Sequence, residues 1–101
     1  MIQSVQQIKF EILAYIKEGG GEFADWYLGV SEDPLKTMRD LHSVDQEADI
    51  WLYRQAQSFN ACRTLARFFV GQLQVDGELP QRGEEDTDCV YLFKKSARTT
   101  P

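Results

Sequence analysis

The sequence predicts a small α/β domain of the α+β type, in which three helices cover a mainly antiparallel sheet of three strands in the order α-β-α-β-α-β. Two observations lead to this prediction. Segments whose apolar residues recur at helical spacing alternate with short segments of period two, and capping residues, glycines or prolines separate them. The 101 residues, of which 43% are hydrophobic and 12% aromatic, supply enough apolar surface for one core.

The first helix is expected over residues 4–18. Ser4 and Gln7 have the spacing of a capping box, in which two side chains satisfy backbone donors at the start of a helix. Three consecutive glycines, residues 19–21, end this helix because glycine loses much backbone entropy in a helix and readily takes positive φ. The apolar residues that define its buried stripe are Val5, Ile8, Ile12, Leu13 and Ile16.

Residues 25–31 predict the first strand, because large apolar residues alternate in it with period two. Gly29 lies inside this strand, where a glycine marks either a bulge or the close approach of another group. Asp33 and Pro34 follow and favour the N-cap and the first position of a second helix, which ends near Ser43.

Residues 50–54 predict the second strand. Ser58 is expected to cap a third helix that continues to about Leu73. Trp26 and Trp51 lie in alternating strands, and we expect both to pack in the core.

The last third of the chain predicts a loop, a strand and a tail. Residues 76–88 are rich in acidic residues, glycine and proline, which indicates a mobile acidic loop. Residues 89–94 predict the last strand, and residues 96–101 a flexible tail. The prediction is therefore a single domain over residues 1–95.

Charge limits the classes of partner. The net charge of −5 argues against a general nucleic-acid coat protein. The negative charge is concentrated in the first half of the chain, so the second half has room for a local basic patch. No apolar run approaches the roughly 20 residues of a membrane span, and no signal-peptide pattern is present. We expect a cytoplasmic protein without a membrane partner.

The sequence contains few residues suited to metal or nucleophilic chemistry. Cys62 and Cys89 are expected to be reduced, buried thiols, with a redox-active pair as the alternative. His42 is the single histidine, and we expect it to pack or to interact with the end of the second helix. We predict no metal site, no cofactor and no catalytic residue.

Residues 26–34, with the sequence WYLGVSEDP, resemble the second signature of GIY-YIG nuclease domains, in which a Tyr-Ile-Gly strand leads into a capped helix. The resemblance covers the strand, helix, strand and helix from about residue 26 to 74. Four positions carry residues typical of the family: Tyr27, Gly29, Asp33 and Met38.

The first signature of the family, a Gly-Ile-Tyr strand, is missing in front of residues 26–31. Residues 89–94 resemble that strand in everything except the glycine. The resemblance therefore implies a permuted arrangement, in which residues 89–94 pair antiparallel with residues 26–31.

The resemblance also implies that the nuclease chemistry is lost. The family has an arginine on the helix after Tyr-x-Gly, and Thr37 stands at that position between Lys36 and Met38. The family's metal-binding glutamate falls near Ala66, and residues 50–75 contain no Asp or Glu. Both groups supply electrostatic stabilisation that such catalysis needs.

We therefore predict a non-catalytic binding module on a degenerate GIY-YIG-like fold, with a protein or a nucleic acid as partner. Tyr27 and Tyr91 are expected to face each other on one side of the sheet. The basic residues are candidates for an anion-binding patch beside them; the alternative is that they are solvated and pair with the acidic first half of the chain. The candidate binding residues are Tyr27, Gly29, Lys36, Arg39, Arg63, Arg67 and Tyr91.

Two alternatives stay open. A divergent metal-dependent nuclease would recruit Lys36 or Arg39 and take a carboxylate from Glu22 or Asp33. A structural or regulatory protein would instead dock its acidic first helix on another chain, with the three glycines as a hinge.

Overall fold

The computed structural model describes residues 1–101 and has an α+β fold with three α-helices. A short 3₁₀ helix and a π-helical turn accompany them. The elements in chain order are α1 (Val5–Gly19), η1 (Phe23–Asp25), β1 (Trp26–Ser31), α2 (Pro34–His42), β2 (Trp51–Gln55), α3 (Phe59–Ala66), η2 (Arg67–Gln72), β3 (Asp76–Gly77) and β4 (Cys89–Lys94).

The starts of the three helices follow from the predicted capping residues. Ser4, Asp33 and Ser58 each accept a hydrogen bond from a backbone N–H in the first turn of α1, α2 and α3. These bonds satisfy donors that have no partner inside a helix. The first helix ends at the glycine run, and Gly20 has a φ of 81°.

The sheet has the strand order β2-β4-β1-β3. The last strand, β4, lies between β2 and β1 and pairs antiparallel with both. The pairing of residues 89–94 with residues 26–31 is therefore confirmed, with Gly29 opposite Tyr91 and Tyr27 opposite Phe93.

The predicted number of strands was wrong, because the sheet has four strands and is mixed. The additional strand, β3, consists of Asp76 and Gly77 and pairs parallel with β1. Two residues are too few to show an alternating pattern, and Asp-Gly is typical of a turn. Gly77 has a φ of 148°, and a Cβ there would lie 2.3 Å from the carbonyl oxygen of Leu28. The close approach of the two strands thus depends on this glycine.

Two further boundaries differ from the prediction. The third helix is not α-helical throughout: α3 ends at Ala66, and η2 continues it as a π-helical turn. There the amide of Leu73 bonds to the carbonyl of Phe68, which is the five-residue spacing of a π-helix. The second strand lies one residue later than predicted, at Trp51–Gln55.

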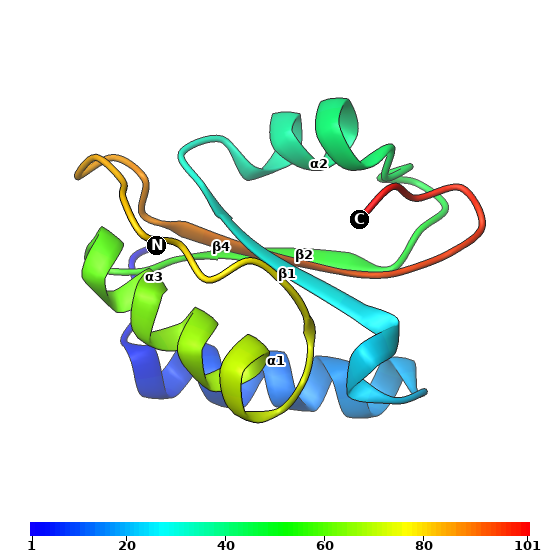
Figure 1. The fold of residues 1–101 in the computed structure, drawn as a ribbon, viewed down its shortest axis with the longest axis horizontal. Helices are drawn as coiled ribbons and strands as arrows, with labels where there is room; N and C mark the ends of the chain where they lie inside the picture. Colours follow the sequence, from blue (N-terminus) through cyan, green and yellow to red (C-terminus); the bar gives the residue numbers. More distant parts are fainter.

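The helices form a layer on each face of the sheet: α1 and α3 cover one face, and α2 covers the other (Figure 1). The larger core lies between the sheet and α1 with α3, and it includes Trp26 and Leu28. The smaller core lies under α2 and includes Met38, Tyr91 and Phe93. None of the helices combines the length and the apolar character that crossing a bilayer would require.

Candidate functional site

Aromatic side chains gather on the α2 face of the sheet. The antiparallel register places Tyr27 on β1 beside Phe93 on β4, with ring centroids 5.2 Å apart and nearly parallel rings. Tyr27 and Tyr91 lie 6.4 Å apart with an angle of 23° between their rings, so the predicted approach of the two tyrosines is confirmed.

Gly29 provides the space that Tyr91 occupies. A Cβ on Gly29 would lie 2.2 Å from the Cζ and Oη atoms of Tyr91. The glycine inside β1 therefore marks the close approach of another group, which is one of the two alternatives left open by the sequence.

His42 is the last residue of α2, as expected, and it is 6% exposed. Its Nε2 lies 2.8 Å from the hydroxyl of Tyr91, and its Nδ1 lies 2.7 Å from the backbone carbonyl oxygen of Thr100. The amide of Thr100 in turn donates to the carbonyl of His42 over 2.7 Å. The C-terminal residues are thus joined to the end of α2.

These contacts fix the direction of the hydrogen bonds. The Thr100 carbonyl can only accept, so Nδ1 of His42 must carry the proton. In the neutral imidazole the Nε2 atom is then the acceptor, and it receives the hydroxyl proton of Tyr91. The Tyr91 oxygen keeps its lone pairs free to accept further hydrogen bonds.

A hollow of about 550 Å³ lies beside these side chains. Tyr27 and Tyr91 line it, and the start of the acidic segment contributes two carboxylates, those of Asp76 and Glu78. We call it the aromatic pocket, and the residues that line it are Tyr27, Leu41, His42, Asp76, Gly77, Glu78, Tyr91 and Pro101.

The electrostatic environment of the aromatic pocket is negative. Burial raises the pKa of the Tyr27 hydroxyl, and the charges of Glu78 and Asp76 raise it further. Burial also raises the pKa of the Tyr91 hydroxyl, with smaller effects from Tyr27 and Glu78. Lys95 is paired with Asp76, its Nζ lying 3.0 Å from Oδ2. No Lys or Arg lines the pocket.

The predicted basic patch is not formed. Arg63 lies on α3 and Arg67 at the start of η2, whereas Lys36 and Arg39 lie on α2. Because α2 and α3 cover opposite faces of the sheet, the two pairs of cations are separated by the sheet itself (Figure 1). Of the candidate residues, the structure brings together Tyr27, Gly29 and Tyr91.

Lys36 lies among carboxylates. It lines a second hollow, of about 650 Å³, whose other charged residues are acidic. A hydrogen bond from Asp86 and its charge raise the pKa of Glu32 there. Arg39 is paired with Asp40 over 3.0 Å. The charged residues of this hollow are Glu32, Asp33, Lys36, Asp40 and Asp86.

Asp33 and Glu22, the two carboxylates considered for a nuclease centre, do not lie together in a metal site. The side chain of Asp33 caps α2, and Glu22 precedes η1. No group of three His, Cys, Asp or Glu side chains is arranged to hold a metal ion. Cys62 and Cys89 are free and buried, as predicted.

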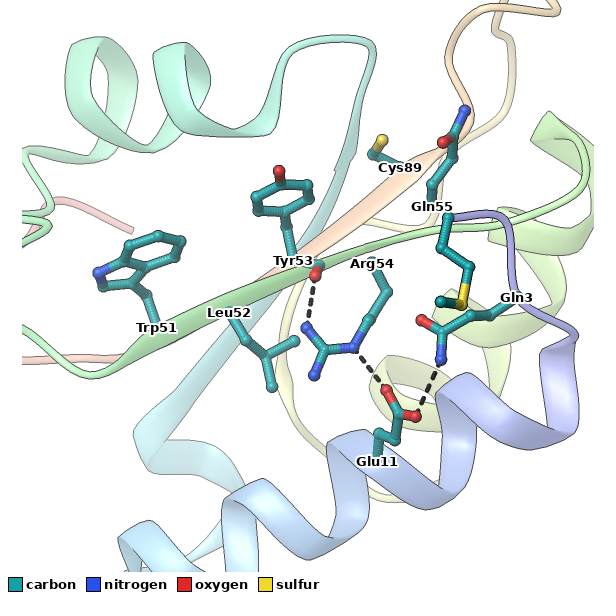
Figure 2. A pocket seen from close by; sticks show the side chains of 9 residues that line it. Gln3, Glu11, Trp51, Leu52, Tyr53, Arg54, Gln55 and Cys89 are labelled. Carbon is teal, nitrogen blue, oxygen red and sulfur yellow. Dashed lines mark hydrogen bonds and ion pairs between the residues drawn. The ribbon is translucent and has the colours of Figure 1, made fainter.

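A third hollow, also of about 650 Å³, follows the outer edge of β2 (Figure 2). Figure 2 shows Arg54 extending from β2 toward Glu11 on α1, where its Nε lies 2.5 Å from Oε1. Three carbonyls of β2 have partners outside the ladder with β4. Tyr15 Oη donates to Trp51 and the Gln3 amide to Gln55, and the side chain of Arg54, itself in β2, donates through Nη1 to Tyr53. These contacts protect an edge strand from pairing with other chains, so we regard them as structural.

The positions of His42, Asp76 and Glu78 at this pocket do not follow from the sequence pattern. The one available signal was that His42 is the only imidazole and lies at a helix end.

No protein-family model, curated protein or solved structure matches the chain.

Proposed function

We propose that the chain is a non-catalytic binding module on a GIY-YIG-like scaffold, and that it binds a protein partner through the α2 side of its sheet. The observation that carries this proposal is the aromatic pocket. It is lined by the two tyrosines that the resemblance singled out, and its lining includes carboxylates but no Lys or Arg.

The charges on this side favour a protein over a nucleic acid. A phosphate group placed near the pocket would meet Asp76 and Glu78, and near Lys36 it would meet several further carboxylates. Nucleic-acid affinity depends largely on Lys and Arg that neutralise phosphates, and repulsion between like charges opposes it. The arginines of α3 and η2 lie on the other face and cannot compensate.

The alternative of a divergent nuclease has less support. Lys36 and Arg39 would have to stabilise a phosphate while surrounded by or paired with acidic side chains. Both features weaken the electrostatic contribution that phosphoryl chemistry requires.

A DNA assay and a peptide titration test the proposal together. The first measures cleavage and binding of a branched DNA duplex at low salt with Mg²⁺ or Mn²⁺, where phosphate contacts are strongest. The second records amide NMR spectra while a short peptide of Arg, Lys, Gly and Ser is added, with a matched peptide of Asp, Glu, Gly and Ser as control. We expect no cleavage, no saturable DNA binding, and shifts on the α2 side with the basic peptide alone.

Three outcomes would contradict the proposal. Metal-dependent cleavage that Lys36→Gln abolishes would establish the nuclease alternative. Basic-peptide shifts confined to α1 and α3, or no shifts at all, would show that the α2 side is not the binding face.

A further inference from the structure

We propose that the aromatic pocket binds a cationic group that carries N–H donors, namely the alkylammonium or alkylguanidinium end of a basic side chain of the partner. This inference rests on the proposed binding function. Beyond that function, we specify the chemical class of ligand that the pocket binds.

The hydrogen-bond chain from Thr100 to Tyr91 makes the pocket an acceptor site. The Thr100 carbonyl holds the proton on Nδ1 of His42, and Nε2 then takes the hydroxyl proton of Tyr91. The hydrogen of Tyr91 is thereby used inside the protein, and its oxygen can only accept from a ligand. A ligand that donates N–H groups is complementary to this arrangement.

The carboxylates add negative charge beside the accepting oxygen. Asp76 is partly neutralised by Lys95, whose Nζ lies 3.0 Å away. Glu78 is exposed and belongs to none of the four ion pairs of the chain. One uncompensated carboxylate therefore lies at the pocket, and a cation would pair with it through a charge-assisted hydrogen bond.

The aromatic rings favour a cation as well. Tyr27 is half-buried and lines the pocket, and the ring centroids of His42 and Phe93 lie 4.7 Å and 5.2 Å from that of Tyr27. Cations are attracted to the faces of tyrosine rings at distances up to about 6 Å. An anionic ligand would be repelled by the two carboxylates.

A titration with small probes tests the ligand class. The probes are n-butylguanidinium, n-butylammonium and n-butylurea; the last has nearly the shape of the guanidinium but no charge. Amide NMR spectra are recorded for the intact chain during each titration. We expect saturable shifts at Tyr27, Gly77 and Tyr91 with the two cations, and their relative affinities distinguish an arginine-like from a lysine-like ligand.

A pair of variants tests whether the pocket carboxylate is responsible. Glu78→Gln removes an exposed charge at the pocket without disturbing the core, and we expect it to weaken cation binding about fivefold. The matched control is Glu18→Gln, which removes one exposed charge from α1 on the opposite face of the sheet. This control should leave the affinity unchanged.

The outcomes separate this inference from the proposed function. If no probe shifts the pocket residues, if butylurea binds as well as the cations, or if Glu78→Gln behaves like Glu18→Gln, the inference is wrong. If the basic peptide nevertheless binds elsewhere on the α2 side, the proposed function still holds. Absence of binding by both the peptide and the probes would overturn both.

Discussion

The ring of Tyr91 lies against the backbone of Gly29 on the neighbouring strand, where a methyl group on Gly29 would be 2.2 Å from the phenol. This contact lets Tyr91 reach His42, to which its hydroxyl is bonded over 2.8 Å. The missing side chain in β1 therefore determines the position of the group that gives the aromatic pocket its hydrogen-bonding character.

Gly29→Ala should destabilise the fold. The new methyl group would collide with a ring that is 4% exposed and cannot move away freely. Such overpacking costs about 3 kcal/mol of unfolding free energy, measured by urea denaturation. Gly71→Ala is the control, because a Cβ there meets nothing within 4 Å. If Gly29→Ala lowers the unfolding free energy as much in a Tyr91→Ala background as in the wild type, the collision with the Tyr91 ring is not the cause of the destabilisation.

Tyr91→Phe should also destabilise the fold, through the loss of one hydrogen bond. The change leaves Nε2 of the buried His42 without its partner, which costs about 1–3 kcal/mol. Urea denaturation at neutral pH measures this cost. Tyr53→Phe, at an exposed tyrosine opposite Tyr91 in the sheet, should change stability little. Equal effects of the two substitutions would count against the His42 bond.

The same tyrosine should make the protein sensitive to alkali. Burial raises the pKa of Tyr91, so the unfolded chain releases this proton at a lower pH than the native protein does. Stability therefore falls as the pH rises above the ordinary tyrosine pKa of about 10. Tyr91→Phe should reduce the decrease of the unfolding free energy with rising pH, measured by urea denaturation. An unchanged decrease would show that Tyr91 does not cause it.

The link between Glu11 and Arg54 should contribute modestly to stability. Both side chains are partly buried, and they join α1 to the edge of the sheet (Figure 2). A double-mutant cycle with Glu11→Ala and Arg54→Ala should give a coupling energy of about 1 kcal/mol at pH 7. Hydrogen bonds from Gln7 and Arg54 lower the pKa of Glu11, so the coupling should persist at pH 7 and disappear as the pH falls through that lowered pKa. If the effects of the two substitutions on the unfolding free energy are additive at pH 7, the prediction is wrong.

The two thiols should be inert in the native protein. Burial raises the pKa of Cys62 to about 12 and that of Cys89 to about 11, the latter with a further contribution from Asp88. The thiolate is the reactive form, so at pH 8 both should react with a disulfide reagent at least about 100-fold more slowly than in guanidinium chloride. Rapid native reaction followed by a disulfide between them would support the redox-active alternative.

Much of the fold was predictable because its signals are local. Ser4, Asp33 and Ser58 cap helices through contacts within one turn. The alternating residues of β1 and the short apolar run of β4 identified these strands, and the resemblance indicated that they pair. Cys62 and Cys89 are buried, as predicted.

The remaining features depend on contacts between distant parts of the chain. The pairing of β3 with β1 joins residues that are about 50 positions apart and leaves no periodic pattern. The bond from His42 to Tyr91 and the bond from His42 to Thr100 span similar separations. The predicted basic patch failed for a related reason, because spacing along the sequence does not reveal that α2 and α3 cover opposite faces.

The most direct test of the central claim is the tautomer of His42. A long-range ¹H–¹⁵N NMR spectrum of the imidazole, recorded at a pH where the ring is neutral, is free of overlap because the chain has a single histidine. We expect the proton on Nδ1, with Nε2 as the acceptor from Tyr91. A proton on Nε2 would force the Tyr91 oxygen to accept from His42, and it would contradict the assignment of the aromatic pocket as a site for cationic donors.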